Sequence, residues 1–150
     1  MAEKLKLGII TDCMAGLNLT EKFINRQSDI SVCKLSKGEA DTEYIEFTRA
    51  NSGKQADFLF DIDAMMISLK PPRVILLVCK HFSQDGLKSL LEKMDKGDTL
   101  IDCCDMSYRE SALNAKMTAR TGISYLGTGF VYATDDIIKR PSFMISGDKN

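Results

Sequence analysis

The chain has 150 residues and a formal net charge of −1, with 44% hydrophobic and 27% charged residues. These are ordinary values for a globular protein, so the chain is long enough to bury a hydrophobic core. No basic stripe marks a nucleic-acid surface, and no apolar run approaches the roughly 20 residues that a membrane span needs. We therefore expect one domain over residues 1–150, with no nucleic-acid partner and no membrane partner.

The cysteine content bears on the cellular compartment. Five cysteines are present, and no C-x-x-C pair occurs among them. An odd number without such pairs argues against a secreted disulfide framework. The first strand is expected by about Leu5, which leaves no room for a signal or transit peptide. The sequence thus predicts a cytoplasmic protein.

The first half of the chain alternates short apolar runs with helical patterns. In chain order we expect a strand over 5–10, a helix that starts near Gly16, a strand over 30–34, an exposed helix over 41–50 and a helix over 61–69. The prolines at 71 and 72 cannot continue that last helix.

The second half contains the clearest strand, because Val74–Val78 is a run of five apolar residues. Such a run implies burial on both faces, as in a parallel sheet. The further expected elements are an amphipathic helix through Leu87, Leu90, Leu91 and Met94, a turn at 96–98, a strand over 99–102, a helix over 108–121 with Gly122 as its C-terminal cap, a short strand over 124–126 and an edge strand over 141–145.

Strands that alternate with helices of this length form βαβ units with right-handed crossovers. The predicted fold class is therefore a Rossmann-like α/β domain with a doubly wound, mostly parallel sheet. In such a fold the turn after the first strand needs glycines, because its backbone N–H groups approach a pyrophosphate closely. Here that turn is Thr11-Asp12-Cys13-Met14-Ala15-Gly16, and only its last residue is glycine.

Seven further segments carry a family resemblance in their order and spacing. They are LGII (7–10), MAGLNL (14–19), KPPRVILLV (70–78), KGDTLID (96–102), SYRES (107–111), GTG (127–129) and PSFM (141–144). Together they resemble the N-terminal coenzyme domain of 6-phosphogluconate dehydrogenase, from about residue 5 to the end. The resemblance implies a dinucleotide fold with NADP as the coenzyme.

The resemblance also implies which positions would contact the coenzyme. Carried over residue by residue, they are Thr11, Asp12, Cys13, Met14, Ala15, Ser36, Lys37, Gly38, Val78, Cys79, Lys80 and Asp105. Most are altered, since Thr11 and Cys13 replace a glycine and a small residue, and Asp12 adds a negative charge beside the pyrophosphate. Lys37 replaces the arginine that grips the 2′-phosphate in the family, and lysine lacks the planar fork of arginine.

The substrate positions implied by the resemblance are altered as well. The family's serine-glycine-glycine falls on Val131-Tyr132-Ala133, and its glycine-glycine-asparagine ends on Asp105. A phosphosugar acid is negatively charged, so Asp105 would repel it and Tyr132 would crowd it. The family's catalytic lysine and glutamate, and its helical domain, fall beyond residue 150, so no catalytic residue is predicted here.

These departures favour a non-catalytic relative that serves as a scaffold, partner-binding or regulatory module, with NADP binding weak or lost. Two alternatives remain. One is a module that still holds NADP or another nucleotide weakly. The other is the coenzyme subunit of an oxidoreductase of the pentose phosphate pathway that acts on 6-phosphogluconate with a separate helical partner. A protein partner or a homodimer is expected at the apolar C-terminal residues, which are Phe130, Val131, Tyr132, Ile137, Ile138, Phe143, Met144 and Ile145.

The cysteines at 13, 79, 103 and 104 each follow an expected strand, so the fold should bring them together at the ligand crevice. With His81 they could bind zinc, or they could form a redox-sensitive cluster if a thiol pKa were lowered. Such cysteines are more often small buried hydrophobes. No metal site is therefore predicted.

Overall fold

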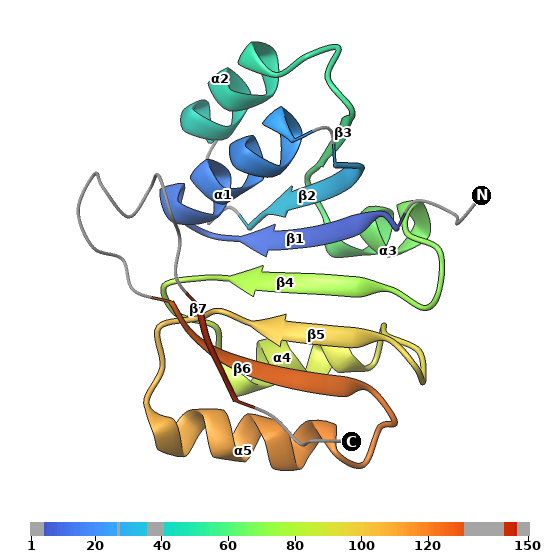
Figure 1. Cartoon of the computed structure of the whole chain (residues 1–150), viewed down its shortest axis with the longest axis vertical. Coiled ribbons are helices and arrows are strands. Elements are labelled where there is room, and N and C mark those ends of the chain that lie inside the picture. Colours follow the sequence, from blue (N-terminus) through green and yellow to red (C-terminus); the bar gives the residue numbers. More distant parts are fainter. Residues whose placement is uncertain (1–4, 27, 36–40, 131–142, 147–150) are drawn as a thin grey trace.

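The computed structural model describes residues 5–26, 28–35, 41–130 and 143–146. These residues form a seven-stranded sheet in the order β3-β2-β1-β4-β5-β6-β7 (Figure 1). Its strands are β1 (Leu7–Thr11), β2 (Ile30–Lys34), β3 (Ala56–Leu59), β4 (Val74–Val78), β5 (Thr99–Asp102), β6 (Ser124–Phe130) and β7 (Phe143–Ser146). The helices are α1 (Met14–Asn25), α2 (Thr42–Ala50), α3 (Ile62–Ser68), α4 (Gln84–Leu91) and α5 (Tyr108–Thr118).

The sheet is parallel from β3 through β6, and β7 pairs antiparallel with β6 at the edge. The chain runs outward from β1 to β3 and then returns to β4, which pairs with β1 in the register Leu7↔Val74 to Thr11↔Val78. The strand order therefore reverses between β1 and β4. In doubly wound sheets, ligands bind beyond the carboxyl ends of the strands at this reversal.

Each face of the sheet has its own apolar cluster. On one face, α1 and α2 supply Leu17 and Tyr44, which pack with Ile9, Val32 and Leu76. The other face is covered by α3, α4 and part of α5, and it buries many of the large aliphatic side chains and three cysteines. Figure 1 shows α1 and α2 gathered by β1 and β2, with α5 beside β6. The central strands are thus covered on both sides, as their apolar sequences require.

Four of the five helices begin with a side-chain cap. Asp41, Asp61, Ser83 and Ser107 each accept a hydrogen bond from a backbone N–H in the first turn of α2, α3, α4 and α5. Such caps satisfy N–H groups that have no partner within the helix. Helix α1 differs, because Cys13 stands at its N-cap position and makes no side-chain capping hydrogen bond.

The predicted fold class is confirmed, and most expected elements lie within a few residues of their predicted positions. Strand β3 was not predicted, because Ala56–Leu59 is short, contains a charged residue and is only partly buried at the sheet edge. The edge strand expected over 141–145 is present as β7. Within the described residues, no helix combines the length and the apolar character required to cross a bilayer.

Two predicted helix ends were wrong. Helix α4 ends at Leu91, so Met94 lies in the following turn although it stays buried. Helix α5 ends at Thr118, so Gly122 does not cap it. Gly122 has a φ of +78° in the turn before β6, and its carbonyl accepts a hydrogen bond from Gly97 N. The positive φ explains why glycine stands there, although its role is in the turn.

Candidate functional site

The candidate site lies at the carboxyl ends of β1 and β4, where the strand order reverses. Thr11, the last residue of β1, is fully buried, and its hydroxyl donates to the carbonyl of Val78 at 2.7 Å. The same oxygen accepts from the backbone N–H of Cys13 at 3.2 Å. A Cβ on Gly16 would lie 2.0 Å from this oxygen. Thr11 therefore fills the space at the start of the loop after β1, and only glycine at 16 lets α1 approach it.

Asp12 extends this contact across the reversal point. Its Oδ1 accepts a hydrogen bond from the backbone N–H of Lys80 at 2.8 Å. The thiol of Cys13 lies 3.6 Å from the Val78 carbonyl oxygen. The loop after β1 and the loop after β4 are thus held together by side chains of the chain itself.

The loop chemistry can be compared with what a pyrophosphate requires. The first turn of α1 has no acidic residue and no side-chain cap, so its N–H groups remain suited to an anion. However, Asp12 places a carboxylate one residue before the N-cap, and Thr11 and Cys13 occupy positions where the resembled family is small. The residues present do not fit the dianionic pyrophosphate of NADP well.

The described residues nearest to the expected 2′-phosphate loop form an ion pair. Ser36, Lys37 and Gly38 lie outside the described residues. On either side of them, Lys34 Nζ lies 2.6 Å from Asp41 Oδ2, and the Lys34 side chain is only 6% exposed. Glu43 lies 3.5 Å from the same ammonium group. The hydrogen bond from Lys34 is the main cause that lowers the pKa of Asp41. The positive charge of Lys34 is therefore already neutralised by carboxylates.

A second polar centre lies beneath the end of β5. Asp102 is 2% exposed, and its Oδ2 accepts from Tyr125 Oη at 2.7 Å and from Asn114 Nδ2 at 3.4 Å. Its Oδ1 accepts from the backbone N–H of Cys104 at 3.1 Å. Burial and the negative charge of Asp102 raise the pKa of Tyr125. Asp102 thus ties β5, β6 and α5 together through neutral donors.

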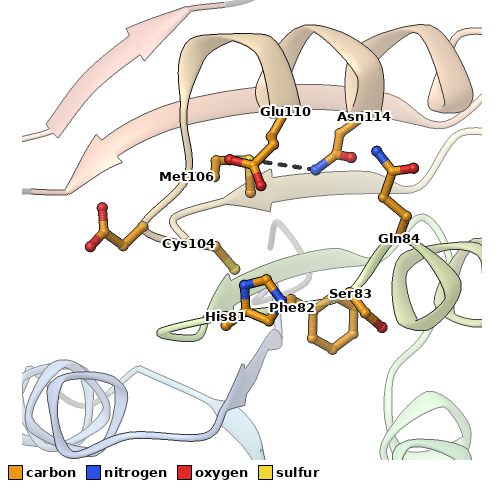
Figure 2. A pocket seen from close by; sticks show the side chains of 9 residues that line it. His81, Phe82, Ser83, Gln84, Cys104, Met106, Glu110 and Asn114 are labelled. Atoms are coloured by element: carbon orange, nitrogen blue, oxygen red, sulfur yellow. Dashed lines mark hydrogen bonds between the residues drawn. The ribbon is translucent and has the colours of Figure 1, made fainter.

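A cavity of about 240 Å³ lies beside this centre and shares Asn114 and Cys104 with it, and Figure 2 shows its lining side chains between the loop after β4 and the start of α5. The Asn114 amide nitrogen faces Asp102 and Met106, so its oxygen must face the other way, and this buried oxygen has no hydrogen-bond partner. At the mouth, Ser107 donates two hydrogen bonds to Glu110 and lowers the pKa of its carboxyl. The cavity is lined by His81, Phe82, Ser83, Gln84, Cys104, Asp105, Met106, Glu110 and Asn114.

All five cysteines are buried as free thiols. Burial raises the pKa of Cys33 to about 12 and that of Cys103 to about 11. A hydrogen bond with Cys79, together with burial, also raises the pKa of Cys104. These shifts are opposite to the lowered pKa that would make a thiol reactive. Among the residues that the structure describes, no group of three or more His, Cys, Asp or Glu side chains could hold a metal ion.

The structure brings together part of the predicted coenzyme site. Thr11, Cys13 and Val78 meet at the reversal point, and Asp12 reaches Lys80. Cys79 points instead into the core with Cys104, and Asp105 lies at the cavity. Met14 is 46% exposed at the start of α1, beside Ala15. Val131, Tyr132 and Ala133 lie outside the described residues, as do Ile137 and Ile138 of the expected C-terminal docking residues.

Two arrangements were missed by sequence reasoning. The Lys34–Asp41 ion pair joins residues that belong to separate expected elements, and no local pattern links them. The Asp102 centre depends on side chains 12 and 23 residues away. The only signal in the sequence is an aspartate that ends an apolar strand, which invites a search for buried donors.

Comparisons with known proteins agree with this architecture. The NAD binding domain of 6-phosphogluconate dehydrogenase is the family that matches this chain, over residues 6–150. The NADP(+)-dependent, decarboxylating 6-phosphogluconate dehydrogenase of Bacillus subtilis is 30% identical over 148 residues, which are 97% of this chain and 31% of that enzyme. The decarboxylating enzyme of Escherichia coli is 27% identical over the same shares of both chains.

A solved structure of the Plasmodium falciparum 6-phosphogluconate dehydrogenase, described in its apo form and in complexes with NADP+ and with 6-phosphogluconate, superposes with a TM-score of 0.82 at 21% identity. The superposition covers 96% of this chain and 31% of that one, and it concerns the fold. The chain thus spans about a third of the length of the relatives it matches. On the match over residues 6–150, this chain belongs to the family of the NAD binding domain of 6-phosphogluconate dehydrogenase.

Proposed function

We propose that this chain is a non-catalytic relative of the coenzyme domain, in which NADP binding is weak and the main role is to bind a protein partner. The observation that supports this is the bridge at the reversal point, where Asp12 accepts the Lys80 N–H and Thr11 holds the Val78 carbonyl. A dinucleotide would have to enter between these two loops. The Lys80 N–H and the Val78 carbonyl, which lie there, are already hydrogen-bonded to Asp12 and Thr11.

The negative charge of Asp12 determines how much NADP affinity we expect the chain to lose. Two like charges about 5 Å apart repel by about 3 kcal/mol at an effective dielectric constant of about 20. A free energy of about 3 kcal/mol corresponds to roughly a hundredfold loss of affinity. The N–H groups of the first turn of α1 offset part of this loss. We therefore expect NADP to bind in the high-micromolar range or more weakly.

Calorimetric titration with NADP tests this proposal. Asp12→Asn removes the charge but keeps an oxygen that can accept the Lys80 N–H, so binding should tighten by roughly ten- to a hundredfold. Asp29→Asn is the matched control, because Asp29 directly precedes β2 at the amino ends of the strands, away from the loop after β1, and should leave the affinity unchanged. Low-micromolar binding by the unchanged chain, with no gain in Asp12→Asn, would contradict the proposal.

The non-catalytic part of the proposal is tested by assay. Asp105 places an exposed carboxylate at the cavity, at a position where the family resemblance expects contact with an anionic sugar acid. We expect no oxidation of 6-phosphogluconate by the purified chain with NADP or NAD. Turnover above background would favour the coenzyme-subunit alternative, and turnover only after addition of a helical partner would define that partner.

A second candidate function is a weak nucleotide-binding module. It is favoured by the uncapped N-terminus of α1, which is the one described helix without a side-chain cap. Binding of a mononucleotide or inorganic pyrophosphate with the same affinity as NADP would support this candidate.

Association with a partner completes the proposal. The C-terminal residues 130–145 carry the apolar side chains on which this expectation depends. Light scattering at working concentration should give a mass above that of one chain, or pull-down should recover a stoichiometric partner. A monomer that captures no partner would contradict this part.

A further inference from the structure

Cys79 and Cys104 occupy facing positions at the ends of two neighbouring parallel strands. The described register of β4 and β5 ends with Leu77 opposite Asp102, and two residues further along each chain lie Cys79 and Cys104. The ladder continues past the strands, because Cys103 N donates to Leu77 O at 2.8 Å and Asp105 N donates to Cys79 O at 3.4 Å. The two cysteines are therefore in register.

Their spacing and direction suit a covalent bond. Neighbouring strands lie about 4.8 Å apart, and a disulfide needs Cα atoms roughly 4.4–6.8 Å apart. Both side chains belong to the apolar cluster on the α3–α4 face, where Cys79 Sγ lies 4.0 Å from the carbonyl oxygen of Ile10 and Cys104 Sγ lies 3.8 Å from that of Leu77.

The two thiols differ in their access to solvent. Cys104 is 5% exposed and lines the cavity, whereas Cys79 is completely buried. The neighbouring Cys103 packs in the cluster on the opposite face, so it is not placed to compete for Cys79. A small molecule in the cavity would reach Cys104 first.

We propose that Cys79 and Cys104 are an oxidisable pair, which forms an intramolecular disulfide when a small hydroperoxide enters the cavity. The Cys104 thiolate attacks the peroxide O–O bond, which breaks to leave Cys104 as a sulfenic acid and to release water once the leaving oxygen is protonated. The Cys79 sulfur then attacks the Cys104 sulfur and displaces its hydroxyl as a second water molecule. Overall, two thiols and one hydrogen peroxide give one disulfide and two waters.

The surroundings of the pair set its rate. The interaction with Cys79, in which the Cys104 thiol is the donor, and burial raise the pKa of Cys104, so little thiolate is present at neutral pH. Since the thiolate is the nucleophile, oxidation should be slow at pH 7 and faster as the pH rises. The disulfide would join the loop after β4 to the loop after β5. It needs no bound coenzyme, so it does not rest on the proposed function.

The experiment is oxidation of the native chain with hydrogen peroxide, followed by alkylation of free thiols and tryptic mapping. Cleavage after Arg73, Lys80, Lys96 and Arg109 places Cys79 in peptide 74–80 and Cys103 with Cys104 in peptide 97–109. The proposal expects these two peptides joined, at a mass two hydrogens below their sum. Cys103→Ala should keep the cross-link and Cys104→Ala should abolish it.

Other outcomes would overturn the proposal. A bond between Cys103 and Cys104 would leave peptide 97–109 alone, at a mass two hydrogens lower. Survival of all thiols at pH 9 under peroxide would show that the pair cannot be oxidised in the folded chain. A cross-link that persists in Cys104→Ala would assign it to Cys103. Oxidation in denaturant gives the distribution expected without native geometry, and a cross-link equally abundant there would also count against the proposal.

Discussion

The two halves of the sheet differ in how far the polar groups at the carboxyl ends of their strands are paired. In the half built from β1 and β2, the polar groups at the carboxyl ends of the strands are paired with one another. Asp12 accepts a hydrogen bond from the Lys80 N–H, and Lys34 forms an ion pair with Asp41. In the half built from β4 and β5, a cavity persists, and the buried Asn114 oxygen beside it has no partner. The half that the family resemblance assigns to the pyrophosphate is therefore the more closed, and the other half retains space for a small molecule.

The two halves also differ in the kind of contact that holds them together. The contacts that close the first half are a buried hydroxyl, a close approach of glycine and a charge pair at the end of a strand. The contacts of the second half are centred on the buried carboxylate of Asp102, which accepts hydrogen bonds from Tyr125, Asn114 and the backbone N–H of Cys104. Substitutions in each half should reveal how far the closure of the first half and the openness of the second depend on these residues.

The largest effect is expected at Asp102, in the second half. Asp102→Ala would leave Tyr125 Oη, Asn114 Nδ2 and Cys104 N–H without their acceptor. Each buried donor left unpaired costs about 1–3 kcal/mol, so the free energy of unfolding should fall by about 3–5 kcal/mol. Urea denaturation measures this loss.

The control for Asp102 is a surface carboxylate. Asp57 pairs with Lys6, and its side chain is 49% exposed. Asp57→Ala should cost less than about 1 kcal/mol, as is usual for exposed ion pairs. Equal losses in the two variants would show that the buried network contributes nothing special to the second half.

The next effect concerns the close approach in the first half. In Gly16→Ala, the new methyl group would lie 2.0 Å from Thr11 Oγ1 and 2.3 Å from Thr11 Cβ. Overpacking of this kind costs about 1–3 kcal/mol, and here the upper end is expected. The double variant Thr11→Gly with Gly16→Ala removes the clash and should recover part of the loss, as thermal unfolding would show.

Gly8→Ala is the matched control for this position. Its new methyl group would meet Leu69 Cδ1 at 2.8 Å, and this atom is the end of a side chain that can move. The loss should therefore be smaller than at Gly16. If the double variant were no more stable than Gly16→Ala alone, the clash with Thr11 would not be the cause.

The regular parts of both halves could be predicted from the sequence, whereas the pairing of their polar groups could not. Val74–Val78 specifies a strand buried on both faces, and Ser107 with Glu110 marks the start of a helix. Strand β3 escaped prediction because its four residues gain their structure from pairing with β2, not from an apolar pattern. The Asp12–Lys80 contact spans 68 positions, so only the strand order makes it possible.

A smaller, pH-dependent effect is expected at Asp41. Asp41→Asn keeps an acceptor for the Tyr44 N–H at the N-cap of α2 but loses the charge that faces Lys34. We expect the free energy of unfolding to fall by about 1–2 kcal/mol at pH 7, because the buried Lys34 then keeps only the more distant carboxylate of Glu43 as a charged partner. The pKa of Asp41 is lowered in the folded chain, so its contribution is present above the usual aspartate pKa and is lost as the pH falls through the folded value.

The stability difference between the unchanged chain and Asp41→Asn should therefore shrink as the pH falls below about 4, the ordinary aspartate value. Glu43→Gln is the matched control, because Glu43 faces the same lysine at 3.5 Å from a side chain that is 63% exposed. It should cost clearly less at every pH. A difference for Asp41→Asn that stays constant from pH 7 to pH 3 would refute the role of the charge.

The smallest effect is expected at the start of α5, where the second half has the cap that α1 lacks. Ser107 Oγ accepts from Glu110 N, while Ser107 N and Oγ donate to the Glu110 carboxylate at 2.8 and 2.7 Å. Ser107→Ala should cost about 1 kcal/mol, the usual loss for an N-cap.

Ser83→Ala at the start of α4 should cost a similar amount, since Ser83 caps Gly86 N without a glutamate. The two variants should separate with pH. The hydrogen bonds from Ser107 lower the pKa of Glu110, so they stabilise the fold above the usual glutamate pKa and cease to do so as the pH falls through the lowered value. The cost of Ser107→Ala should therefore decrease in acid while that of Ser83→Ala stays constant. Parallel pH profiles would mean that the hydrogen bonds to the Glu110 carboxylate add no stability at α5. The N-terminus of α5 would then differ from that of α1 only by the hydrogen bond from Glu110 N to Ser107 Oγ.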